Sequence, residues 1–282
     1  MTTPWTTLVD AGTLAGALDR DDLVVLDCRF SLAAPEAGPA AYAASHLPGA
    51  LYAHLDRDLS DHRKRGGGRH PWPDAADFDA RLGDWGITPD HQVVAYDDGD
   101  GAHAARLWFL LRALGHKRAA VLDGGRARWM ALGLPTQTGV RDVTRVARTE
   151  RFDGNRLLDA TQVQAHLAHG GMLVDARARE RFRGDVEPID RVAGHVPGAV
   201  NRPYADNLAG GRFKSREQLA GEFRELLGPH RADDVVMMCG SGVTACHHLL
   251  AMEHAGLPGA KLFTGSWSGW IEDPQRPVAT GP

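Results

Sequence analysis

Short apolar runs alternate with amphipathic stretches along the chain. Residues 23–26, 93–96 and 119–122 each have the pattern of a buried strand, and residues 104–114 have the length and pattern of a helix. This alternation is typical of parallel sheets covered by helices on both faces. We therefore predict the α/β fold class, with small parallel sheets flanked by helices.

The same four landmarks occur twice along the chain, in the same order. The first copy is longer than the second between its second and third landmarks, and the surplus falls on the glycine- and proline-rich residues 63–73. The duplication predicts two tandem domains of one fold. The paired landmarks are residues 26–29 with 174–177, 46–50 with 195–199, 93–96 with 235–238, and 122–125 with 263–266.

A chain of 282 residues exceeds the usual size of one domain, which agrees with this duplication. We assign residues 1–138 to a non-catalytic N-terminal domain and residues 157–282 to a catalytic C-terminal domain. The polar, charge-rich residues 139–156 are expected to link them.

Candidate chemistry lies at Cys239, which follows the apolar run of residues 234–238 and precedes a helix-like segment. A turn of this kind can direct several backbone N–H groups at one point, and the start of a helix adds positive potential that favours a thiolate. A cysteine at the end of a strand can also be a small buried hydrophobe. The residues of the predicted cradle are Gly240, Ser241, Gly242, Val243 and Thr244.

Attack on phosphorus and attack on sulfur both use a cysteine on such a turn. A cysteine-dependent phosphatase needs an arginine six positions after the cysteine, and that position is Ala245. In the first copy, Asp97 stands where the nucleophile would be. The first domain therefore cannot run the same chemistry, and we expect it to form a wall of the site in the second.

Both halves resemble rhodanese domains, and nearly the whole chain resembles tandem-domain sulfurtransferases that use thiosulfate or 3-mercaptopyruvate. Position 269 is Gly here and is often Glu in relatives. The motifs that carry the resemblance are Tyr42 with residues 46–50, residues 174–177, 194–199 and 239–244, and the segment 265–270.

The resemblance points to 3-mercaptopyruvate as the donor, because loops with Arg and Lys in place of Gly240 and Ser241 are more typical of thiosulfate enzymes. 3-Mercaptopyruvate carries a single negative charge, on its carboxylate, so the positively charged residue that binds it is expected outside the cysteine loop. Arg181 matches the family position for this cation. A second arginine usually follows a Glu-Pro pair, but Ile189 stands there, and the nearest candidate is Arg191.

The resemblance also implies that Asp56 and His70 handle protons or orient Ser241, with His70 carried to the second domain by the extra loop. The alternative is that Asp56 belongs to an ordinary acidic turn and that His70 is one unremarkable histidine among 14; given the resemblance, we favour the functional roles.

These expectations combine into one mechanism. The Cys239 thiolate takes sulfur from 3-mercaptopyruvate as a persulfide and passes it to a thiol, cyanide or a thioredoxin-like protein, with no cofactor or metal. Thiosulfate is the alternative donor, and a sulfur-relay or regulatory binding module with low turnover is the alternative of another class. Cys28 and Cys246 are expected in the core, although a redox role for Cys246 stays open.

The net charge of −4 and a pI near 6.4 argue against nucleic acid as a partner. The first residues lack the pattern of a signal peptide, and the most apolar run, residues 107–111, is too short to cross a membrane. Three cysteines cannot all pair within one chain. We expect a cytoplasmic protein with no membrane partner.

Overall fold

The structure is a computed structural model that describes residues 3–139 and 142–282. The chain divides into two compact units. The first unit comprises residues 1–61, 73–153 and 210–212, and the second comprises residues 62–72, 154–209 and 213–282. Residues 140–141, within the expected linker, and residues 1–2 lie outside the description.

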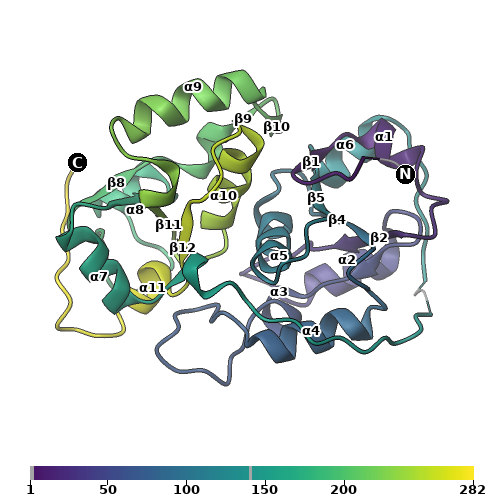
Figure 1. Cartoon of the computed structure of the whole chain (residues 1–282), viewed down its shortest axis with the longest axis horizontal. Helices are drawn as coiled ribbons and strands as arrows, with labels where there is room; N and C mark the ends of the chain where they lie inside the picture. Colours follow the sequence, from purple (N-terminus) through teal and green to yellow (C-terminus); the bar gives the residue numbers. More distant parts are fainter. Residues whose placement is uncertain (1–2, 140–141) are drawn as a thin grey trace. The chain divides into compact units, whose positions relative to one another are not determined.

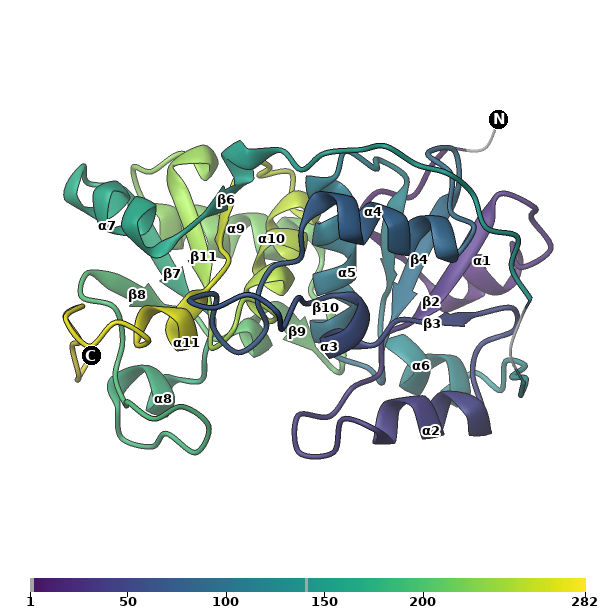
Figure 2. The same cartoon turned by 90° about the horizontal axis from the view of Figure 1, so that it is seen from below.

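The first unit is built on a five-stranded sheet of order β1-β5-β4-β2-β3, in which every neighbouring pair is parallel. Leu14 of α1 and Trp129 of α6 join one buried cluster with alternate strand residues such as Val25 and Val94. Helix α5 contacts β4 and β5 (Figures 1 and 2). Its elements are β1 Leu8–Val9, α1 Ala11–Ala15, β2 Leu23–Asp27, α2 Ala37–Ala44, β3 Leu51–Tyr52, α3 Leu55–Asp58, α4 Ala75–Asp84, β4 Gln92–Tyr96, α5 Ala102–Ala113, β5 Ala119–Leu122 and α6 Gly125–Ala131.

The second unit repeats this plan with a parallel sheet of order β6-β12-β11-β7-β8. Val163 of α7 and Trp270 of α11 share a buried cluster with the strand residues Val236 and Phe263, while α10 contacts β11 and β12. Three short 3-10 turns complete it, together with the paired strands β9 and β10, of which Arg212 in β10 belongs to the first unit. Its elements are β6 Leu157–Leu158, α7 Ala160–Ala168, β7 Met172–Asp175, α8 Arg179–Arg183, β8 Ala199–Asn201, β9 Leu208–Ala209, β10 Arg212–Phe213, α9 Arg216–Leu227, β11 Val235–Met238, α10 Ala245–His254, β12 Lys261–Phe263 and α11 Ser266–Trp270, with turns at Gly154–Arg156, Tyr204–Asn207 and Ala232–Asp234.

The predicted fold class and the duplication are therefore confirmed. The predicted strand of residues 119–122 is β5, and the predicted helix of residues 104–114 is α5, which begins two residues earlier. The duplication extends to buried ion pairs, since Arg29 Nη2 lies 2.6 Å from Asp27 Oδ2 and Arg177 Nη2 lies 2.7 Å from Asp175 Oδ2.

Cys28 and Cys246 lie in the core, as expected. Cys28 is 1% exposed, and burial raises the pKa of its thiol well above the usual range. The Cys246 thiol is buried and donates to the carbonyl of Gly242 at 3.3 Å. All three cysteines are free thiols.

Across the described ranges, 3–139 and 142–282, the structure contains no helix that is both long and apolar enough to span a membrane.

A buried polar network anchors α10 in the second unit. His248 Nδ1 accepts from Asn207 Nδ2 at 2.8 Å, and His248 Nε2 lies 2.7 Å from the carbonyl oxygen of Arg202. Only the neutral imidazole with its proton on Nε2 satisfies both contacts. Burial is the main cause that lowers the pKa of His248 to about 3; the charges of Arg202 and His247 act in the same direction and outweigh, together with burial, the opposite effect of the hydrogen bond with the Arg202 carbonyl.

We predict that acid destabilises the protein through His248. Its pKa is below the unfolded value of 6.5, so the stabilisation is complete above pH 6.5 and is lost as pH falls toward 3. At pH 5 the loss is about 2 kcal/mol for this one residue. Urea unfolding followed between pH 7.5 and pH 5 measures it.

The variant His248→Gln should show a shallower pH dependence than the wild type, whatever its stability at pH 7.5. The control is His169→Gln, because His169 is exposed and should leave the pH dependence unchanged. Equal slopes for His248→Gln and the wild type would contradict the prediction.

Candidate functional site

Cys239 lies at the carboxyl end of β11, where a tight loop leads into α10. The residue is 1% exposed. Its Sγ accepts a hydrogen bond from the backbone N–H of Gly242 at 3.1 Å. Gly242 has φ of 77°, a left-handed conformation that favours glycine, and this lets the loop curl back over the sulfur.

The first residues of α11 orient the cysteine loop. The N–H of Trp267 donates to the carbonyl of Cys239 at 2.9 Å, and the N–H of Ser268 donates to the carbonyl of Gly240 at 2.8 Å. In a trans peptide the carbonyl and the following N–H point in opposite directions. The N–H groups of Gly240 and Ser241 therefore point away from α11.

The N–H groups of the loop are available to a ligand. In the part of the chain that is described, the N–H groups of Gly240, Ser241, Val243 and Thr244 donate to no acceptor. Helix α10 also has no side-chain cap at its first turn, whereas α7 and α9 each begin with a capping box. Such a set of N–H groups can bind an anion or a developing negative charge.

Ser266 supports the cysteine, and sequence reasoning missed it. Its φ is 49°, and it is the only non-glycine residue with positive φ among the described residues. Its Oγ accepts from the N–H of Cys239 at 3.1 Å and donates to the carbonyl of Phe263 at 3.0 Å. A left-handed serine costs about 1–3 kcal/mol. The hydroxyl fixes the backbone of Cys239 in return.

His70 and Ser241 form a buried pair in the second unit. His70 Nδ1 lies 2.8 Å from Ser241 Oγ, and the two residues are 4% and 6% exposed. His70 belongs to residues 62–72, which we call the 62–72 loop and which are part of the second unit. The loop thus brings the predicted histidine to the predicted serine.

The 62–72 loop lies on α11 through close backbone contacts. The N–H of Gly68 donates to Glu272 Oε1, and the N–H of Arg69 donates to Ser268 Oγ, each at 2.9 Å. A Cβ on Gly68 would lie 2.5 Å from the carbonyl oxygen of Gly265, and a Cβ on Gly269 would lie 3.3 Å from the N of Gly68. Glycine at position 269 therefore makes room for the loop.

Arg181 is held at the cysteine loop by two buried carboxylates. Its Nη2 lies 2.7 Å from Glu187 Oε1 and 3.0 Å from Asp190 Oδ2. Burial raises the pKa of Glu187, but hydrogen bonds from Arg181 and from the backbone of Asp190 and Ile189 outweigh burial, so that pKa is lowered. A Cβ on Gly240 would lie 3.7 Å from Arg181 Nη1.

A second guanidinium at this place comes from Arg69, which the sequence did not indicate as a site residue. Its Nη1 lies 2.5 Å from Asp190 Oδ1, and its Nη2 would lie 3.1 Å from a Cβ on Gly240. Arg191, the second arginine that the sequence suggested, is instead exposed and donates to the carbonyl of Ile271.

The other expected residues are placed as follows. Val243 is buried and Thr244 is partly exposed at the start of α10. Asp56 is partly buried in α3 of the first unit, where its N–H donates to His54 Nδ1 at 3.1 Å. Its proposed proton-handling role stays a prediction.

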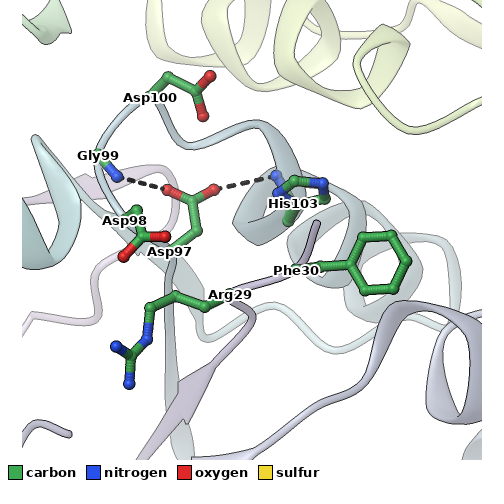
Figure 3. Close-up of a pocket in the computed structure, with 7 residues that line it drawn as sticks. All are labelled: Arg29, Phe30, Asp97, Asp98, Gly99, Asp100 and His103. Atoms are coloured by element: carbon green, nitrogen blue, oxygen red, sulfur yellow. Dashed lines mark hydrogen bonds between the residues drawn. The ribbon is translucent and has the colours of Figure 1, made fainter. Parts of the chain in front are cut away.

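The first unit has the matching loop after β4, but its own carboxylate fills it. Asp97 accepts the N–H groups of Gly99 and Gly101 on Oδ1 and those of His103 and Ala104 on Oδ2, at 2.9–3.1 Å. Figure 3 shows the bonds from Gly99 and His103. Burial and the charge of Asp100 raise the pKa of Asp97. A pocket of about 410 Å³ adjoins this loop; it is lined by Arg29, Phe30, Asp97, Asp98, Gly99, Asp100 and His103.

A metal ion has one candidate position among the described residues. Asp61, Asp74 and Asp77 of the first unit place carboxylate oxygens within 4.8 Å of one another. Exposed acidic groups are common without an ion, so this cluster alone does not define a site.

Comparison with known proteins agrees with this geometry. The family model "Rhodanese-like domain" matches residues 10–132 and 159–273. A Pseudomonas aeruginosa protein named "Probable 3-mercaptopyruvate sulfurtransferase" is 50% identical over 97% of this chain and 98% of its own. A Mycobacterium tuberculosis protein named "Putative thiosulfate sulfurtransferase SseB" is 43% identical over 97% of both chains.

Solved structures match as well. The 3-mercaptopyruvate sulfurtransferase from Leishmania major superposes with a TM-score of 0.85 and 29% identity, over 97% of this chain and 77% of that one. The enzyme SseA from Escherichia coli gives a TM-score of 0.80 and 29% identity, over 94% of this chain and 100% of that one.

We predict that Gly68→Ala dislodges the 62–72 loop. The added methyl would meet the backbone oxygen of Gly265 at 2.5 Å, and the backbone there has φ of 78°. Left-handed strain costs about 1–2 kcal/mol, and overpacking adds about 1–3 kcal/mol. Trypsin cleavage within the loop, at Arg63, Lys64, Arg65 or Arg69, should accelerate.

Gly66→Ala is the matched control, because Gly66 has φ of 77° but its Cβ would lie no closer than 3.8 Å to Glu272. It carries the strain without the clash, so cleavage should rise less. Equal cleavage rates for the two variants would show that contact with α11 does not hold the loop.

Proposed function

We propose a sulfur-transfer reaction at Cys239, because this chain belongs to the rhodanese family. The donor is 3-mercaptopyruvate, and the acceptor is a thiol, cyanide or a thioredoxin-like protein. One observation carries the proposal: the Cys239 sulfur lies beside the His70–Ser241 pair, in a loop where the N–H groups of Gly240, Ser241, Val243 and Thr244 have no acceptor among the described residues.

In the first half-reaction the Cys239 thiolate attacks the sulfur of the donor. A sulfur–sulfur bond forms, the carbon–sulfur bond of the donor breaks, and its electron pair leaves as the enolate of pyruvate. The proton of the donor's thiol ends on the enolate carbon. The products are pyruvate and a Cys239 persulfide anion.

In the second half-reaction a thiolate or cyanide attacks the outer sulfur of the persulfide. The new bond to sulfur forms as the sulfur–sulfur bond to Cys239 breaks, and the electron pair returns to Cys239 as a thiolate. The N–H groups of Gly240, Ser241, Val243 and Thr244 stabilise the anionic sulfur in both states. Neither half-reaction requires a cofactor or a metal.

Ser241 and His70 together stabilise the enolate. The Ser241 hydroxyl donates to the keto oxygen, on which negative charge develops as the carbon–sulfur bond breaks, and His70 orients that hydroxyl through the 2.8 Å contact. Arg181 binds the carboxylate of the donor.

Thiosulfate is the second candidate donor, and the relationship to the M. tuberculosis protein favours it. The uncharged Gly240 and Ser241 favour the monoanionic mercaptopyruvate. We place the reaction in the cytoplasm, without nucleic acid or membrane partners.

We predict that 3-mercaptopyruvate adds the mass of one sulfur atom to Cys239. Mass spectrometry of the donor-treated protein should find the adduct on the peptide that contains Cys239, and cyanide should remove it. Cys239→Ser should lose the adduct and all sulfur transfer. A relay or binding module would show the adduct with little steady-state turnover, and faster turnover with thiosulfate would reverse the donor assignment.

Cys246→Ser is the matched control, because the hydroxyl can keep the hydrogen bond to the carbonyl of Gly242. This variant should keep both the adduct and the turnover. An adduct confined to Cys246 or Cys28 would refute the assignment of Cys239.

We predict that His70 and Ser241 act as one unit. Ser241→Ala and His70→Gln should each lower kcat by about 100- to 1,000-fold, since one positioned donor to a developing oxyanion contributes roughly this much. The double variant should lose little more than either single variant, because each removes the same interaction. Losses that multiply would show that the two residues act separately.

A further inference from the structure

We infer that Arg69, on the 62–72 loop, is the second arginine that binds the anionic group of the sulfur donor, together with Arg181. This inference rests on the proposed function and assigns one of its specificity-determining residues. It replaces Arg191, which the sequence had suggested for this place.

The two guanidinium groups each place an NH₂ group near the same point. A Cβ on Gly240 would lie 3.1 Å from Arg69 Nη2 and 3.7 Å from Arg181 Nη1. Neither of these two nitrogens has a hydrogen-bond partner among residues 3–139 and 142–282. Two unused NH₂ groups therefore converge beside the residue that follows the nucleophile.

Asp190 fixes the relative position of the two arginines. Its Oδ1 lies 2.5 Å from Arg69 Nη1, and its Oδ2 lies 3.0 Å from Arg181 Nη2. One buried carboxylate thus bridges the groups, with its side chain 4% exposed, while those of Arg69 and Arg181 are 23% and 16% exposed. The free NH₂ groups are positioned before a ligand binds, which lowers the entropy cost of binding.

Gly240 is in close contact with Arg69 at this point. Its φ is not positive, so the backbone itself does not require glycine. A Cβ there would lie 3.1 Å from Arg69 Nη2, so that the guanidinium would have to shift by a few tenths of an ångström. The guanidinium of Arg69 thus occupies the space beside the loop into which a side chain at position 240 would extend.

A carboxylate suits this arrangement. It is planar and offers two oxygens, so that each oxygen can accept from one guanidinium. The carboxylate of an α-keto acid that is bound here would lie next to Gly240, and the carbon chain would lead toward the sulfur of Cys239 at the adjacent position. Arg69 would then set the position of the donor relative to Cys239 as well as pair with its negative charge.

The test compares Arg69→Gln, Arg69→Lys and the control Arg65→Gln with the wild type. Arg65 is an exposed arginine on the same loop, so its variant reports only the loss of one loop charge. With 3-mercaptopyruvate, Arg69→Gln should raise KM about 10- to 100-fold with kcat within about threefold, because a charge-assisted hydrogen bond is lost. Arg69→Lys should recover part of the KM, and Arg65→Gln should stay within about twofold.

A second measurement is independent of turnover. Pyruvate should protect Cys239 of the wild type from alkylation by iodoacetamide, and Arg69→Gln should need about 10- to 100-fold more pyruvate for the same protection. If the wild type turns over only thiosulfate, the proposed donor is wrong, and the pyruvate measurement still decides the role of Arg69.

Three results would overturn the inference. One is an Arg69→Gln variant whose KM and pyruvate protection both match the wild type. Another is a fall in kcat at unchanged KM that Arg69→Lys does not recover, which would mark a structural role. The third is a wild-type protein that pyruvate does not protect at all.

Discussion

Two backbone hydrogen bonds set the direction of each loop that ends a central strand. In the second unit the N–H groups of Trp267 and Ser268 bond the carbonyls of Cys239 and Gly240; in the first unit those of Arg126 and Ala127 bond the carbonyls of Asp97 and Asp98. Because peptide planes are rigid, fixing these carbonyls turns the following N–H groups to the opposite side. The cradle is a consequence of this constraint, and it exists in both copies.

The two copies differ in what occupies the cradle. In the first unit the Asp97 carboxylate accepts four backbone N–H groups, so the loop already contains its own anion. In the second unit Cys239 Sγ accepts one, from Gly242. A carboxylate has four lone-pair positions and saturates the loop, whereas a sulfur leaves N–H groups for a substrate. One residue after the strand thus separates a closed loop from a reactive one.

The strands and the duplicated sheets could be predicted from the sequence, because local patterns determine them. Apolar runs indicated β2, β4, β5 and β11, and the repeated landmarks indicated two sheets of one topology. The sequence could not indicate Arg69, because that side chain reaches the cysteine loop through contacts of the 62–72 loop with residues of α11 such as Ser268 and Gly269, and no local pattern encodes contacts between residues so far apart. Ser266 was missed for a related reason: its Oγ accepts from the N–H of Cys239, which is distant in the sequence. The backbone has a positive φ at this position in both units, 49° at Ser266 and 51° at Gly125.

The charge balance around Arg69 and Arg181 bears on whether a singly or a doubly charged donor is favoured. Arg69 and Arg181 are matched by Glu187 and Asp190, whose side chains are each 4% exposed. The group is therefore formally neutral before a donor binds, and its charges stay fixed because each arginine is paired. A bound monoanion leaves one excess negative charge, and a dianion leaves two, in a place where water screens poorly. In the binding mode that we propose, the same two arginines thus disfavour a doubly charged donor, although they add cations beside a loop that has none of its own.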